Sequence, residues 1–143
     1  MRSAGSRFLC CVWLLALIVT GCESPAPQGV GVEGKVVTAD QQPLSAAVIT
    51  LEPMPGTPGP NASTGIFDGR FEFSPEAGLR GGQYRVRISL LPPEMRRSLP
   101  PDIAAKAPPA DAVIAPKYDG ESDISCELRP DQPNALTFTV DFL

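Results

Sequence analysis

Histidine is absent from the sequence of 143 residues. This absence removes the side chain that most often acts as a general base near neutral pH and that most often binds transition metals. No Ser-x-x-Lys or Gly-x-Ser-x-Gly arrangement is present to activate a hydroxyl group. We therefore expect a protein that is not an enzyme and that requires no cofactor.

Basic residues are few and scattered. Lys and Arg total 12 against 16 Asp and Glu, the net charge is −4, and the largest basic cluster is Arg96-Arg97. Nucleic-acid binding requires a basic patch or stripe. The charge balance therefore predicts that nucleic acid is not a partner.

The sequence also lacks an apolar run long enough to span a bilayer. The run from Phe8 to about Val19 follows two basic residues, Arg2 and Arg7. A membrane-spanning helix needs about 20 apolar residues, whereas the apolar region of a signal peptide has roughly 7–15. We predict that residues 1–21 are an export signal that is cleaved.

The residues at the end of this run, Val19-Thr20-Gly21-Cys22, resemble the lipobox of bacterial lipoproteins. The resemblance implies that the Cys22 thiol carries diacylglycerol and that the mature chain begins there. Two or more acyl chains anchor a protein stably. We expect an exported protein, held in the cell envelope by its N-terminal lipid, and Glu23 after the cysteine favours the outer membrane. The mature chain retains ten Lys and Arg against 16 Asp and Glu, a net charge of −6.

Processing leaves a single other cysteine, Cys126, because Cys10 and Cys11 lie in the signal. No intrachain disulfide is then available. Cys126 alternates with Ile124 and Leu128, which predicts a buried position rather than a reactive thiol.

The mature chain begins with a segment rich in Pro, Gly and small residues at 22–31, which is typical of a flexible tether. From residue 32 to residue 143, short segments of alternating polarity are separated by turn residues, which indicates strands in a single domain. The inward residues are expected to be Val32, Gly34 and Val36; Tyr84, Val86, Ile88 and Leu90; Ile124, Cys126 and Leu128; and Leu136, Phe138, Val140 and Phe142. Another segment, Ala46–Pro53, is predicted to form a strand that ends at Pro53.

The clearest local signal is "STGIFDGRFEF". Asp68-Gly69 favours a two-residue hairpin turn with positive φ, so we expect Ile66 to face Phe71 and Thr64 to face Phe73. About seven strands with one apolar face each are best buried by two packed antiparallel sheets. The sequence predicts an all-β protein, an antiparallel Greek-key β-sandwich with a long Pro-rich loop.

Several of these segments resemble one family. "VEGKVV", "QPLSAAVITLEP", "FDGRFEF" and "GGQYRVRISL" are similar to the carboxypeptidase regulatory-like domain of the transthyretin-like superfamily, whose sandwich is Ig-like. "APKYDGESD" and "FTVDFL" are similar to small planctomycete-type lipoproteins that carry this domain. The resemblance implies an accessory, adhesive or spacer module. The hydroxyisourate hydrolases of the superfamily depend on histidines and a C-terminal Tyr-Arg-Gly-Ser motif, whereas this chain ends in "TVDFL".

Two candidate sites follow from the charged residues. Arg85 and Arg87 point outward on one strand, and with Arg70 they form either a basic stripe for a glycan, a solute or a protein partner, or an ordinary solvated face. Asp119, Glu121 and Asp123 provide alternate carboxylates of the kind that calcium binds, but without the glycine and distal glutamate of an EF-hand. A solvated turn is the alternative. A small hydrolase or a calcium-dependent module is the least favoured function.

The Pro-rich insertion spans residues 91–117, with Pro-Pro pairs starting at 92, 100 and 108 and Pro116 after them. Proline suits the first position of a helix, so each repeat is compatible with a short helical turn. It is equally compatible with extended polyproline. Long loops of this kind are often functional or disordered.

Overall fold

The computed structural model describes residues 29–143. The predicted signal peptide, Cys22 and the tether up to residue 28 lie outside these residues. The strands and helices are, in chain order, β1 (Val32–Thr38), β2 (Ala47–Pro53), β3 (Ala62–Ile66), β4 (Arg70–Phe73), η1 (Pro75–Ala77), β5 (Gly82–Leu90), α1 (Pro93–Arg97), α2 (Pro101–Ala104), η2 (Pro116–Tyr118), β6 (Ser125–Leu128) and β7 (Asn134–Val140).

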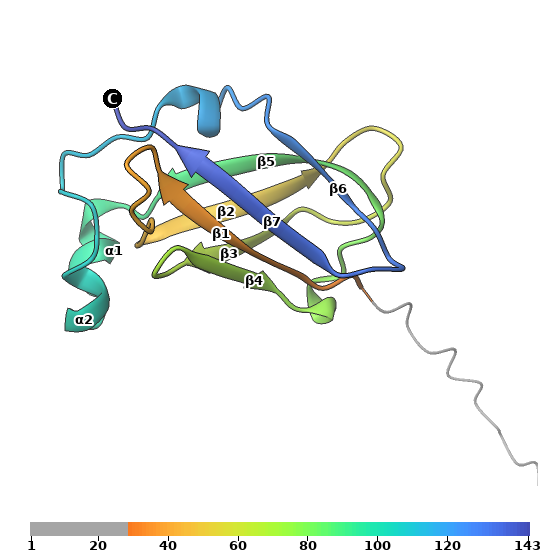
Figure 1. Ribbon diagram of the computed structural model, residues 1–143, viewed down its shortest axis with the longest axis horizontal. Coiled ribbons are helices and arrows are strands. Elements are labelled where there is room, and N and C mark those ends of the chain that lie inside the picture. The colour runs from red at the N-terminus through yellow and green to blue at the C-terminus, as the bar shows by residue number, and fades with distance from the viewer. Residues whose placement is uncertain (1–28) are drawn as a thin grey trace, which may run out of the picture.

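The strands form two sheets that pack face to face (Figure 1). One sheet has three strands in the order β4-β1-β7, and the other has four in the order β3-β2-β5-β6. The core between them consists of Val32, Val36, Leu44, Ala47, Ile49, Leu51, Ile66, Phe71, Phe73, Leu79, Tyr84, Val86, Ile88, Ile114, Leu128 and Val140. The prediction of a mainly β protein with two packed sheets is confirmed.

The predicted strand faces are confirmed in the central strands. Tyr84, Val86 and Ile88 of β5 have no exposed surface, and Cys126 packs against the core from β6. The prediction for Phe142 is wrong. β7 ends at Val140, and Phe142 is 37% exposed and forms only an isolated bridge to Ile114.

The expectation of purely antiparallel sheets is also wrong, because β1 and β7 pair in parallel, with Val32 opposite Asn134 and Thr38 opposite Val140. Antiparallel pairing is enforced only where a short hairpin joins two strands. β1 and β7 are separated by most of the chain, so their direction is set by the path around the sandwich.

The turn at Asp68-Gly69 is confirmed, but the ladder expected around it is wrong. Both turn residues have positive φ, 51° and 71°, and Phe67 and Arg70 exchange backbone hydrogen bonds of 2.9 and 3.0 Å. Beyond this bridge the two strands separate: β3 pairs with β2, and β4 pairs with β1. The longer strands β1 and β2 offer more backbone partners, and the split places Ile66 and Phe71 on the two inner faces of the sandwich.

The Pro-rich insertion adopts helical turns rather than extended polyproline in its first two repeats. Pro93 and Pro101 occupy the first turns of α1 and α2, where the missing N–H has no intrahelical partner to lose. The third repeat contains a turn in which the Ala112 N–H bonds to the carbonyl of Pro109, 3.0 Å away. An ion pair of 2.8 Å between Lys106 and Asp68 joins the insertion to the β3–β4 turn.

The two ends of the sandwich differ. Figure 1 shows α1, α2 and the C-terminus at one end, whereas residue 29 enters β1 from the other. Residues 29–31 are bonded to the domain, since the Val30 N–H donates to the Leu79 carbonyl at 2.8 Å. Over residues 29–143, none of the helices is long and apolar enough to cross a membrane.

Candidate functional site

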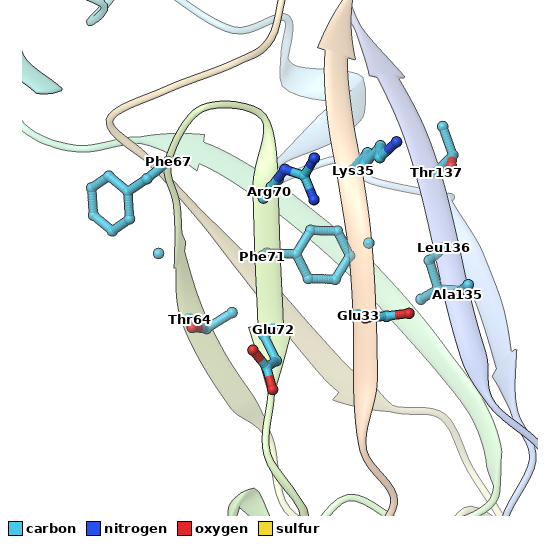
Figure 2. Close-up of a pocket in the computed structure, with 12 residues that line it drawn as sticks. Glu33, Lys35, Thr64, Phe67, Arg70, Phe71, Glu72, Ala135, Leu136 and Thr137 are labelled. Carbon is cyan, nitrogen blue, oxygen red and sulfur yellow. The ribbon is translucent and has the colours of Figure 1, made fainter.

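An open groove of about 630 Å³ lies on the outer side of the three-stranded sheet and extends past β4 to β3 (Figure 2). It is lined by Glu33, Gly34, Lys35, Thr64, Gly65, Phe67, Arg70, Phe71, Glu72, Ala135, Leu136 and Thr137. Its lining therefore comes from β1, β3, β4 and β7 and from the turn between β3 and β4. This size is within the usual range of small-molecule sites.

Strand alternation determines which groups reach the groove. Phe71 and Leu136 pack toward the core, so charged and small polar residues project from the outer face at the positions between them. β7 presents only Ala135 and Thr137, which leave space beside the longer side chains of β1 and β4. The exposed ring of Phe67 stands near the β3 side of the groove, as Figure 2 shows.

The charged residues of the groove are sorted by sign. In the β1–β4 ladder Glu33 lies opposite Glu72, and Lys35 lies opposite Arg70. Figure 2 shows the two carboxylates toward one end and the two cationic groups toward the other. Among the contacts of residues 29–143, none of these four side chains takes part in an ion pair or a side-chain hydrogen bond.

The structure does not bring the three predicted arginines together. Arg70 belongs to the groove, whereas Arg85 and Arg87 lie on the outer face of the four-stranded sheet, on the opposite side of the sandwich. The expectation of one continuous basic stripe is wrong, because β4, which carries Arg70, and β5, which carries Arg85 and Arg87, belong to different sheets.

Arg87 is moreover paired with acidic residues. Its Nη1 lies 3.0 Å from Glu52 Oε1, and its Nη2 lies 2.8 Å from Asp119 Oδ1. Hydrogen bonds to Glu52 and then to Asp119 raise the pKa of the Arg87 guanidinium. Arg85 is exposed and has no ion-pair partner within the described part of the chain. Of the two predicted arginines on this face, Arg87 is paired, and Arg85 is the one without an ion-pair partner within residues 29–143.

The candidate calcium ligands are also dispersed. Asp119 accepts hydrogen bonds from Arg87, while Glu121 and Asp123 are exposed. In the part of the chain that the structure describes, no group of three His, Cys, Asp or Glu side chains is arranged to hold a metal ion.

Cys126 is half-buried on β6, opposite Tyr84. Burial raises the pKa of its thiol to about 11. A thiolate, the nucleophilic form, is therefore scarce at neutral pH. The other predicted cysteine site, lipidation at Cys22, lies outside the described residues.

Sequence patterns did not indicate the role of Arg96, which organises the Pro-rich insertion. Its side chain is 7% exposed, and its guanidinium donates to the carbonyls of Pro108, Pro109 and Ala110 at 3.0, 2.6 and 3.1 Å. A smaller cavity of about 270 Å³ lies beside it, between α1 and the residues after α2. The three acceptors are 12 to 14 residues away, so no local pattern marks the contact.

Comparisons with protein-family models, with curated proteins and with solved structures found no match for this chain.

Proposed function

We propose that the protein is a non-catalytic, lipid-anchored module of the bacterial cell envelope that binds another envelope component through the groove on β4, β1 and β7. The observation that carries this proposal is the set of four charged side chains in the groove, none of which has an ion-pair partner within residues 29–143. Charges of this kind are available to a partner without first breaking contacts inside the protein.

The chemistry of the chain supports a binding role over catalysis. The sequence contains no histidine, and burial keeps the Cys126 thiol protonated. The groove is lined by carboxylates, cations and threonine hydroxyls, which suit the binding of a charged partner.

The proposed anchoring and family rest on sequence. The lipobox resemblance supports lipidation at Cys22, and the four strand motifs support a Greek-key, transthyretin-like sandwich of about seven strands. Two packed sheets of three and four strands are compatible with that finer assignment. The adhesive or spacer role of such modules agrees with a domain whose two outer faces are open to solvent.

Site-specific photo-cross-linking in cells tests the proposed function. A photoreactive residue replaces Thr137 in the groove or, as a matched control, Ser125 on the opposite face beside Arg85; both positions are exposed. We expect a defined adduct with an envelope component from position 137 and none from 125. An adduct from position 125 alone would indicate that the partner binds the face that carries Arg85. No adduct from either position would favour a passive spacer.

A further inference from the structure

The groove places two pairs of like charges directly opposite each other across β1 and β4. Residues directly opposite in an antiparallel pair have Cβ atoms about 4.5–5.5 Å apart, and like charges there are destabilising. The groove contains two such pairs in succession, Glu33 with Glu72 and Lys35 with Arg70. If the acid and the base on one of the two strands were exchanged, each acid would lie opposite a base. A ligand that neutralises both pairs removes this repulsion.

The two pairs are separated by a fixed distance. Glu33 and Lys35 are two residues apart on β1, and Glu72 and Arg70 are two apart on β4. With a rise of about 3.3 Å per residue, the backbone positions of the acidic pair lie about 7 Å from those of the basic pair along the strands. The groove is therefore an electric dipole whose axis follows β1.

The remaining groove residues suit an elongated ligand that lies along this axis. Ala135 is opposite Glu33 and Thr137 is opposite Lys35 in the β1–β7 ladder. Their short side chains leave open space on the β7 side, and the Thr137 hydroxyl is placed to donate to an anion held by Lys35. Thr64 and Phe67 border the other side, where an apolar group can contact the Phe67 ring.

We propose that this groove binds a zwitterion whose cationic and anionic groups are about 7 Å apart, with the cation at Glu33 and Glu72 and the anion at Lys35 and Arg70. This inference rests on the proposed function and names the chemical class of the ligand. A peptide of two residues with free termini meets the requirement, because an extended chain spans at most about 3.3–3.6 Å per residue. A polyanion or a polycation does not, because it would meet two like charges at one end.

Titration of the ¹⁵N-labelled domain, followed by the amide NMR signals, tests this inference with a series of alanine peptides. The probes are alanine, dialanine and tetraalanine with free termini, together with N-acetyl-dialanine and dialanine amide. We expect the amides of Gly34, Lys35 and Thr137 to shift with dialanine. Blocking either terminus, or changing the length, should weaken binding roughly two- to fivefold, as expected for the loss of an exposed ion pair.

Charge-neutral variants assign each end of the ligand. The double variant Glu33→Gln with Glu72→Gln should bind dialanine and its N-acetyl form equally. Lys35→Met with Arg70→Met should bind dialanine and its amide equally. Arg85→Gln, on the opposite face, should retain the full preference for dialanine.

The inference is overturned if wild type shows no shifts with any probe, or if all probes shift the same amides with equal affinity. It is also overturned if the neutral variants, with unchanged spectra elsewhere, keep the wild-type preferences. A cross-link from position 137 combined with any of these results would leave the proposed function intact and reject only the zwitterion. If that cross-link is absent but dialanine binds selectively, the zwitterion site is kept and the proposed binding of an envelope component is rejected.

Discussion

Gly34 lies on β1 between the acidic and the basic pair of the groove, at a position that has no room for a side chain. It faces Phe71 across the β1–β4 ladder, and the buried ring occupies the space that a side chain would need. A Cβ at this position would overlap Phe71 Cζ and would lie 2.5 Å from the carbonyl oxygen of Leu136. The backbone oxygen cannot move without disturbing the β1–β7 ladder.

Gly34→Ala should therefore destabilise the domain by about 1–3 kcal/mol, the range for overpacking in a well-packed core. The urea midpoint measured by circular dichroism checks this. Gly120→Ala is the matched control, because a Cβ there meets nothing within 4 Å. An equal loss of stability in both variants would contradict the packing argument.

Asp141 connects the C-terminal segment to η2. Its carboxylate accepts hydrogen bonds from the Tyr118 hydroxyl at 2.7 Å and from Lys117 at 3.1 Å, and these contacts, Tyr118 first, lower the pKa of Asp141 below its ordinary value of 3.8. A lowered carboxyl pKa stabilises the folded state above the unfolded value, and this stabilisation is lost as pH falls through the folded value. The contribution is thus complete above pH 3.8 and disappears below it.

An NMR titration of the Asp141 carboxyl should give a midpoint below 3.8. Tyr118→Phe removes the larger cause and should move the midpoint up toward that value. A midpoint that stays where it is in this variant would show that the Tyr118 contact does not hold the carboxylate.

Individual inward residues could be predicted from the sequence, but the groove could not. Alternation within one strand shows that Glu33 and Lys35 face away from Val32 and Val36. Their apposition with Glu72 and Arg70 depends on the register between β1 and β4, which are separated by two other strands. No local pattern fixes that register.

At the scale of elements, the hairpin sequence also shows that local patterns do not predict which strands pair. The turn at Asp68-Gly69 is determined by local backbone preference and was predicted. The strands that follow it pair elsewhere, because Ile66 and Phe71 are both buried when β3 and β4 join different sheets. A turn signal therefore predicts a reversal of the chain but not the partner of each strand.

The Pro-rich insertion depends on Arg96, which joins α1 to residues 108–110. Arg96→Met should lower the free energy of local opening of the insertion by roughly 1–3 kcal/mol, since the carbonyls of residues 108–110 lose their charged donor. The sheets should be less affected, because segments of this kind can open without global unfolding. Hydrogen exchange at Ala112, whose N–H bonds to the Pro109 carbonyl, measures this effect.

Arg97→Met provides the control for Arg96, since the Arg97 side chain is 76% exposed and its contact with Glu94 is 3.8 Å long. It should leave exchange in the insertion unchanged. Similar exchange rates in the two variants would mean that the turns of the insertion hold without the guanidinium.

At the scale of the whole molecule, the proposed anchor and the groove have separate tests. Cys22→Ala should abolish lipidation, so that the variant lacks the mass of the acyl chains and leaves the membrane fraction. Intact-mass measurement and cell fractionation check both effects. An unchanged mass and an unchanged membrane fraction would contradict the lipoprotein assignment without affecting the folded domain.

The positions of the chain ends bear on how such an anchored domain meets a partner. Residue 29 enters at one end, while α1, α2 and the C-terminus lie at the other (Figure 1). The groove runs along the strands between these ends. The groove is therefore a lateral surface of the domain, and the insertion lies at the end opposite to residue 29 (Figure 1).

The most direct test of the central claim, that the charged groove is the binding surface, is the yield of the in-cell cross-link from position 137 when the groove charges are removed. Glu33→Gln, Lys35→Met, Arg70→Met and Glu72→Gln are combined in one variant, and Arg85→Gln serves as the control for a lost charge elsewhere. We predict that the adduct disappears in the combined variant, at unchanged protein level and with no loss of thermal stability, and persists in the control. An adduct that persists in the folded, membrane-attached combined variant would contradict the account.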